Sequence, residues 1–389
     1  MASISTVESQ PSAAVAPSTI PRPHERLASL DAFRGITIAA MILVNDPGSW
    51  SAVYWPLDHA AWNGWTPTDL VFPFFLFIMG AAMEFSFAAR GRQQAGRSNS
   101  ILLHVLYRAA AIFAIGLFLH MFPFYPWHRV RIMGVLQRIA VCYLFAALIM
   151  MKAGPRLRAA IVAALLLGYW ALMMLVPVPG YGAARLDEAG NLAAYIDRRL
   201  MAGHTYRAMF DPEGLLSSLP AIASTLLGGF AGSWLRSPAS QQRKVFGLVA
   251  AGAIGLVLGE IWNSWFPINK NLWSSSYAIF TAGFACILLA LCYWLMEVKH
   301  WKRWASPFLV LGKNAIAAFV LSILLAKALL IIKFNVAGKR TSAWNYVFQH
   351  AFAPLATPKM ASLLFALTFV LLCWLAMLPL YRKKIFLKI

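Results

Sequence analysis

Residues 45–80 contain a short loop caught between two strongly apolar segments: NDPGSWSAVYWPLDHAAWNGWTPTDLVFPFFLFIMG. The loop holds one histidine, His59. Around it lie four tryptophans and four polar residues: Trp50, Trp55, Trp62, Trp65, Asn45, Asp58, Asn63 and Asp69. Tryptophan collects where the hydrocarbon of a bilayer meets the head groups, and polar side chains at that depth cost free energy unless partners or a function retain them. We therefore predict an active site in this loop.

The composition is that of a polytopic membrane protein. Hydrophobic residues make up 60% of the chain and charged residues 12%, and the mean hydropathy is +0.65. A soluble domain could not bury so much apolar surface. The net charge of +20 would suggest nucleic acid in a soluble protein. Here the cations lie mainly in short connections between apolar runs, so we interpret the charge as membrane topology and expect no nucleic-acid partner.

The apolar runs predict an all-α bundle of about ten transmembrane helices. Each run has roughly the twenty residues needed to cross the hydrocarbon. They lie near residues 30–48, 67–88, 103–121, 132–151, 159–177, 218–235, 245–263, 276–296, 307–332 and 361–381. Residues 1–25 are rich in Ala, Ser and Pro and predict a disordered cytoplasmic tail rather than a signal peptide. Residues 26–389 are expected to form one transmembrane domain.

The basic connections predict the orientation of the bundle. Lys and Arg cluster near residues 90–97, 152–158, 236–244, 299–303 and 382–388, and the positive-inside rule puts these connections in the cytoplasm. Both termini are then cytoplasmic. The loop that holds His59 carries no Lys or Arg, so it is predicted on the extracytoplasmic side.

One long connection, about residues 178–217, is also predicted outside. Within it Leu192, Ile196 and Leu200 recur at every fourth residue, which predicts an amphipathic helix on the membrane surface or a helix that covers the top of the bundle. Asp211, Pro212 and Glu213 follow. We interpret them as the N-cap, first-turn proline and first-turn acid of the next spanning helix.

Charged residues within the apolar runs are the strongest functional pointers in a membrane protein. Asp31 and Arg34 lie one turn apart and form either a local ion pair or part of an anion site. Arg138 forms either an ion pair with Glu260 or a substrate contact. Lys313, which precedes Asn314, either meets a phosphate or extends its ammonium to the interface.

Two further features are a polar segment before the apolar run near 276–296 and four cysteines. The segment that begins Asn269-Lys270-Asn271 is either a polar rim that faces a sugar or ordinary helix capping. The four cysteines, Cys142, Cys286, Cys292 and Cys373, all fall inside apolar runs. They offer neither a disulfide framework nor a metal-binding spacing, so we expect no metal site.

Five blocks of sequence, in order from about residue 26 to the C-terminus, together resemble a known family. They read LASLDAFRGITIAAMILVN, LDHAAWNGWTPTDLVFPFFLFIMG, IMGVLQRIAVCY, DPEGLLSSLPAI and NKNLWSSSY. The family is that of heparan-α-glucosaminide N-acetyltransferase and its bacterial relatives. The resemblance implies transfer of an acetyl group from cytoplasmic acetyl-CoA to the amine of a glucosamine residue on the far side of the membrane.

The resemblance assigns the catalytic residues. It makes His59, in the HAxWNG block, the catalytic residue, and it places Asn45 in the same site. A neutral imidazole either removes the proton of the attacking amine or takes the acetyl group itself, and the sequence does not separate these routes. The amide of Asn45 is suited to stabilise the oxyanion. Asp58 or Asp69 would orient the imidazole, unless Asp69 is only a buried partner at the start of its helix.

The remaining assignments concern the donor and the acceptor. Coenzyme A carries several phosphates, which we assign to Arg34 and Lys313, with Asn314 and Arg138 as further contacts. The sugar contacts are predicted to be Asp58, Trp62, Asn63, Asn269 and Lys270. We expect an integral protein of the bacterial inner membrane, with a homodimer plausible from the relatives. The alternative is an amino-sugar transporter that does no chemistry.

Overall fold

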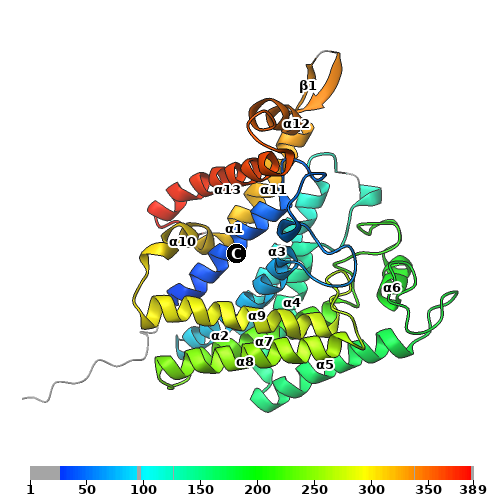
Figure 1. Ribbon diagram of the computed structural model, residues 1–389. Coiled ribbons are helices and arrows are strands. Elements are labelled where there is room, and N and C mark those ends of the chain that lie inside the picture. Colours follow the sequence, from blue (N-terminus) through cyan, green and yellow to red (C-terminus); the bar gives the residue numbers. More distant parts are fainter. Residues whose placement is uncertain (1–26, 94–97, 126, 337, 387–389) are drawn as a thin grey trace, which may run out of the picture.

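The computed structural model describes residues 27–93, 98–125, 127–336 and 338–386, so the predicted tail, 1–25, lies outside the described residues. The described part is a helical bundle with one short β-hairpin (Figure 1). Its helices and strands are α1 (Ala28–Asn45), α2 (Val71–Gln93), α3 (Ser98–Met121), α4 (Val135–Lys152), α5 (Pro155–Leu175), α6 (Leu192–Leu200), α7 (Ser218–Arg236), α8 (Gln241–Asn263), α9 (Ser275–Tyr293), α10 (Ser306–Lys313), α11 (Ala315–Ile331), β1 (Lys333–Val336), β2 (Lys339–Ser342), α12 (Ala343–Val347) and α13 (Pro358–Arg382).

The prediction of a polytopic membrane bundle is confirmed, and the exact number of spanning helices stays a prediction. Among the described residues, eight helices are long and apolar enough to cross a membrane. A ninth span results if α10 and α11, which cover the single run predicted near 307–332, are one crossing bent by 71°. The predicted run over 218–235 forms α7, which is rich in Gly, Ser and Thr and does not meet this test. The orientation of the termini stays a prediction.

Helix α7 lies in the interior of the bundle and packs on α2 without intervening side chains. A Cβ atom on Gly80 of α2 would lie 1.8 Å from the carbonyl oxygen of Thr225. A Cβ atom on Gly228 of α7 would likewise lie 1.9 Å from the carbonyl oxygen of Phe77. The two backbones are therefore in contact, as small residues allow between membrane helices. This packing fixes α2, and Asp69 lies in the turn that leads directly into it.

A second backbone contact joins α1 to α10. A Cβ atom on Gly35 would lie 1.9 Å from the carbonyl oxygen of Phe308, and one on Gly312 would lie 2.0 Å from that of Asp31. Figure 1 shows α1 crossing between the layer that contains α7, α8 and α9 and the group formed by α10, α11 and α13. Helix α1 therefore links the two parts of the bundle.

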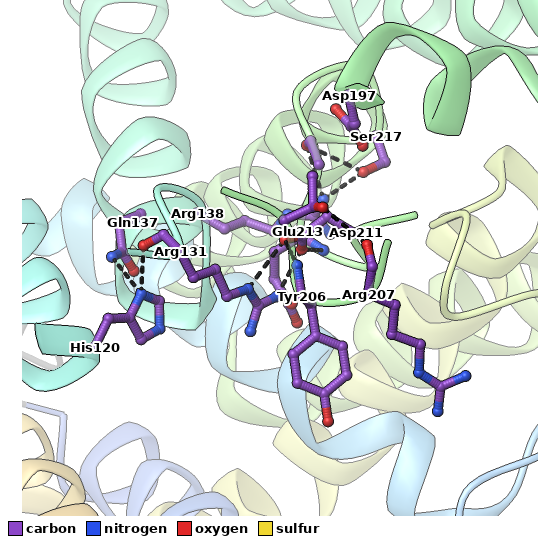
Figure 2. Close-up of polar contacts among 12 residues, drawn as sticks. His120, Arg131, Gln137, Arg138, Asp197, Tyr206, Arg207, Asp211, Glu213 and Ser217 are labelled. Carbon is purple, nitrogen blue, oxygen red and sulfur yellow. Dashed lines mark hydrogen bonds and ion pairs between the residues drawn. The ribbon is translucent and has the colours of Figure 1, made fainter. Parts of the chain in front are cut away.

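The predicted helix in the connection over 178–217 is confirmed as α6. The interpretation of Asp211 and Glu213 as the start of the next spanning helix is wrong, because α7 begins only at Ser218. Both carboxylates instead pair with Arg131, from the connection between α3 and α4. Local helix-start signals were outweighed by a long-range ion pair, which attaches the connection to the bundle (Figure 2).

Candidate active site

The loop between α1 and α2 is shaped by a capping box at its end. The segment Thr66-Pro67-Thr68-Asp69 forms a 3₁₀ turn that leads into α2, with proline in its first turn. The backbone N–H of Thr66 donates to Oδ2 of Asp69 at 3.0 Å, and the Thr66 hydroxyl lies 3.2 Å from the same oxygen. The pattern of threonine followed three residues later by an acid is a known helix-start signature. It turns Asp69 back toward the loop and buries it.

The other oxygen of Asp69 meets His59. Imidazole Nδ1 lies 2.7 Å from Oδ1 of Asp69, and the N–H of Ala60 donates to Oδ2 at 3.1 Å. Because a carboxylate only accepts hydrogen bonds, this pair places the proton on Nδ1 and leaves a lone pair on Nε2. The His59 side chain is 39% exposed and the Asp69 side chain 1%. A buried carboxylate therefore orients an imidazole that solvent and ligands can reach.

A lysine from a distant part of the chain completes this group. Nζ of Lys270, in the connection between α8 and α9, lies 3.0 Å from Nδ1 and 3.2 Å from Nε2 of His59. It also lies 3.6 Å from Oδ1 of Asp69. Burial lowers the pKa of the Lys270 ammonium, and the negative charge of Asp69 opposes that effect. Three titratable side chains thus meet at one point, and both Asp69 and Lys270 lie within hydrogen-bond distance of His59.

The connection that carries Lys270 is attached to the His59 loop by two hydrogen bonds. The N–H of Gly64, whose φ of +93° favours glycine, donates to the carbonyl oxygen of Ile268 at 2.7 Å. The amide of Asn269 donates to the side-chain oxygen of Asn63 at 3.1 Å. Asn269 also accepts from the N–H of Leu272 within the turn before α9, and the predicted alternative of helix capping applies to Ser274, the N-cap of α9. These contacts fix the two segments relative to each other.

A cavity of about 480 Å³ opens beside the imidazole. It is lined by Val53, Trp55, Asp58, His59, Ala60, Ala61, Asn63, Gly64, Trp65, Thr66 and Lys359. Aromatic faces with a few polar groups suit a sugar ring. Lys359, at the start of α13, was missed by sequence reasoning, because it is separated from the loop by about 300 residues and no local pattern connects the two.

The predicted sugar contacts divide into two sets. Asp58 and Asn63 line the cavity, and Asp58 also accepts from the backbone N–H of His59 at 2.8 Å. Trp62 is not among the described cavity-lining residues, because its indole N–H donates to the carbonyl oxygen of Leu186 and its ring packs edge-on against Phe210. The structure therefore gives Trp62 a role in anchoring the loop over 178–217.

Asn45 and Asp46 lie at the C-terminal end of α1, at the start of the same loop. The side chain of Asn45 is exposed and is not among the described residues that line the cavity. Its neighbour Asp46 is buried, and burial raises the pKa of this carboxyl to about 7. The assignment of Asn45 to the site stays a prediction.

Three of the four predicted contacts for coenzyme A lie together at the other end of α1. Arg34 forms the expected ion pair with Asp31 at 2.8 Å and reaches the carbonyl oxygen of Gly312 at 3.4 Å. Lys313 follows directly and lies over the rings of Tyr381 and Phe386. The amide of Asn314 donates to the carbonyl oxygen of Ile385. The bend between α10 and α11 places these polar groups beside Arg34.

Arg138 lies apart from this group, in the interior beside the connection over 178–217 (Figure 2). It donates to the carbonyl oxygen of Gly214 and to the hydroxyl of Ser217, and its guanidinium lies over the Trp273 ring. The suggested ion pair with Glu260 is wrong, because Glu260 instead accepts from Asn263 at the surface. Nε and Nη1 of Arg138 are buried without a hydrogen-bond partner among the described residues.

Residues 26–259, more than half of the chain, match the family model described as heparan-alpha-glucosaminide N-acetyltransferase, catalytic. The chain belongs to this family. The matched range contains His59, Asp69 and Arg138 but ends before Lys270 and Lys313.

Two curated relatives carry the same name. The heparan-alpha-glucosaminide N-acetyltransferase of Homo sapiens is 32% identical over 354 residues, which cover 76% of this chain and 52% of the relative. The protein of that name from Mus musculus is 31% identical over 366 residues, covering 78% of this chain and 54% of the relative. The chain therefore spans about half the length of the curated relatives it matches. The predicted family resemblance is confirmed.

Proposed function

We propose that this protein is a membrane N-acetyltransferase that moves an acetyl group from cytoplasmic acetyl-CoA to the amine of a glucosamine-type sugar on the extracytoplasmic side. One observation carries the proposal: the buried carboxylate of Asp69 orients the imidazole of His59 at the edge of a cavity lined by aromatic and polar side chains. The family membership and the names of both relatives support the same activity.

The geometry of the pair suits general-base catalysis. An amine attacks a thioester only in its unprotonated form, so a base must lie beside the acceptor. With Nδ1–H held by Asp69, Nε2 of His59 presents the lone pair that takes the proton. In the second route Nε2 itself takes the acetyl group and passes it to the amine. Asn45 is proposed to donate a hydrogen bond to the oxyanion in either route.

The predicted coenzyme A contacts lie at two separate places and are proposed to bind different parts of acetyl-CoA. Arg34, Lys313 and Asn314 form one group and are proposed to meet the phosphates of coenzyme A at the cytoplasmic face. Arg138 is proposed to contact a polar part of the donor within the membrane. Its two buried nitrogens without a hydrogen-bond partner among the described residues support this role, because an acceptor oxygen there would satisfy them.

Acetyl transfer in purified protein tests the proposal. The protein in lipid nanodiscs receives acetyl-CoA with a labelled acetyl group and glucosamine, and we expect one CoA thiol released for each labelled amide. His59→Ala should reduce the rate by about 10²-fold or more. Asp69→Asn should reduce it by a similar factor, because an amide nitrogen facing Nδ1 forces the proton onto Nε2.

A matched control is His350→Ala. His350 is exposed and stacks on Tyr346 outside the cavity, so this variant should keep the wild-type rate. Full acetylation by His59→Ala would overturn the catalytic assignment. The alternative, an amino-sugar transporter, would instead move glucosamine into sealed vesicles without releasing thiol. The location in a bacterial inner membrane and the homodimer stay predictions.

A further inference from the structure

Lys270 contacts the imidazole rather than the middle of the cavity. Its ammonium lies within 3.2 Å of both ring nitrogens of His59 and 3.6 Å from Asp69, and it is not among the described residues that line the cavity. An ammonium only donates hydrogen bonds, so with Nδ1–H held by Asp69 its single acceptor on the ring is Nε2. The ammonium also lies 3.0 Å from Nδ1, but this nitrogen carries a proton and cannot accept a hydrogen bond, so that contact is electrostatic only.

The position of Lys270 is set by its neighbours in the chain. Ile268 and Asn269 both bond to the His59 loop, and the N–H of Trp273 donates to the Lys270 carbonyl oxygen. The Lys270 side chain is 21% exposed, about half the exposed fraction of His59. It therefore enters the group from the protein side, while the imidazole faces the cavity.

Charges of both signs face His59. Asp69 lies against one ring nitrogen and Asp58 bonds to the His59 backbone. Lys270 lies against the ring, and Lys359 lines the same cavity. Glu213 acts on Lys270 from the connection before α7. The Asp69 charge alone would favour imidazolium, which cannot act as a base, and the Lys270 ammonium is the cation that directly opposes it.

We infer that Lys270 is a positioning residue for His59: its ammonium keeps the imidazole beside Asp69 unprotonated and in place, and it does not bind the sugar. This inference rests on the proposed function. The amine of the acceptor replaces Lys270 at Nε2 and gives its proton to that nitrogen. Lys270 then remains beside Asp69, which is already within 3.6 Å.

Carbethoxylation by diethyl pyrocarbonate tests this role of Lys270 without relying on acetyl transfer, because the reagent reacts with a histidine only when its imidazole is unprotonated. The rate of labelling at His59 is followed by peptide mass spectrometry between pH 5 and pH 8 on the full chain in nanodiscs. Two unit charges about 3 Å apart change a protonation equilibrium by about tenfold even at the dielectric constant of water. Lys270→Met should therefore move the midpoint of labelling about one pH unit higher.

Three further variants complete the test. Lys270→Arg keeps the charge and should keep the wild-type midpoint. Lys359→Met removes a cation from the same cavity that makes no hydrogen bond to the imidazole, and it should also leave the midpoint unchanged. Lys270→Gln is neutral but can still donate a hydrogen bond, and it replaces Lys270→Met if that variant does not fold. An unchanged midpoint in a folded neutral variant would overturn the inference.

The steady-state kinetics separate this role from a sugar contact. In Lys270→Met the acid limb of kcat should move to higher pH while KM for the sugar stays constant. A raised KM with an unmoved limb would show that Lys270 binds the sugar instead. If the wild-type protein transfers no acetyl group at all, the proposed function fails, and the labelling experiment still decides what Lys270 does to His59.

Discussion

Replacing Asp46 by asparagine should change how the stability of this protein depends on pH. Asp46 follows the last residue of α1 and is 7% exposed, and burial raises the pKa of its carboxyl from 3.8 to about 7. The folded state then binds more protons than the unfolded state between these values. The stabilisation due to the protonated carboxyl is therefore complete below about pH 4 and is lost as the pH rises through 7.

The size of the effect follows from the same two values. Linkage at one group with these folded and unfolded pKa values lowers the free energy of unfolding by roughly 3 kcal/mol between pH 5 and pH 8. The side-chain amide in Asp46→Asn does not titrate, so the variant should lack this loss. Thermal unfolding of both proteins in detergent, followed by tryptophan fluorescence, measures the difference at each pH. Other titrating groups cancel in that difference.

The quantity compared is the thermal unfolding midpoint of the wild type minus that of Asp46→Asn at each pH. The wild-type midpoint should fall relative to the midpoint of Asp46→Asn as the pH increases from 5 to 8. Two curves that run parallel over this range would refute the reasoning. They would mean that the carboxyl of Asp46 finds a partner or water in the folded state and ionises at its usual pH.

Two other perturbations follow from the packing and from the cationic group. Gly80→Ala puts a Cβ atom 1.8 Å from the Thr225 carbonyl oxygen, so it should lower stability by about 1–3 kcal/mol or more. Gly168→Ala meets nothing within 4 Å and should have no such effect in the same thermal unfolding assay; equal midpoints would contradict the α2–α7 contact. Arg34→Met and Lys313→Met should each weaken the binding of radiolabelled acetyl-CoA by about tenfold, the size of one hydrogen bond to a charged group, with the exposed Lys302→Met as control. Unchanged affinity in both would remove these residues from the donor site.

The helices of this bundle could be predicted from the sequence because their signals are local. A run of about twenty apolar residues must form its backbone hydrogen bonds within itself when it crosses a bilayer. Helices therefore appear at all the predicted positions. Among the described residues, α10 and α11 meet the test of span length and composition only as a bent pair. Helix α7 does not meet it, and its glycines serve packing against α2. The bend between α10 and α11 carried no signal that hydropathy detects.

The candidate site shows the same division between local and long-range information. The isolated histidine in a loop rich in tryptophan predicted the location of the site, and the capping box of Thr66 and Asp69 is also readable as a sequence pattern. The choice between Asp58 and Asp69 as partner of the imidazole was not readable. It depends on how the loop turns back onto the start of α2, and there Asp69 contacts the ring while Asp58 bonds to the backbone.

What the sequence determined by itself is the membrane bundle, the loop that carries His59 and the family, because hydropathy, composition and matching blocks are properties of neighbouring residues. Only the tertiary structure decided which charges meet. Lys270 reaches His59 across 211 positions of sequence, Arg131 pairs with Asp211 across 80, and Arg138 bonds to Ser217 rather than Glu260. Such contacts depend on the depth and rotation at which whole helices pack, and close backbone contacts at glycines set both.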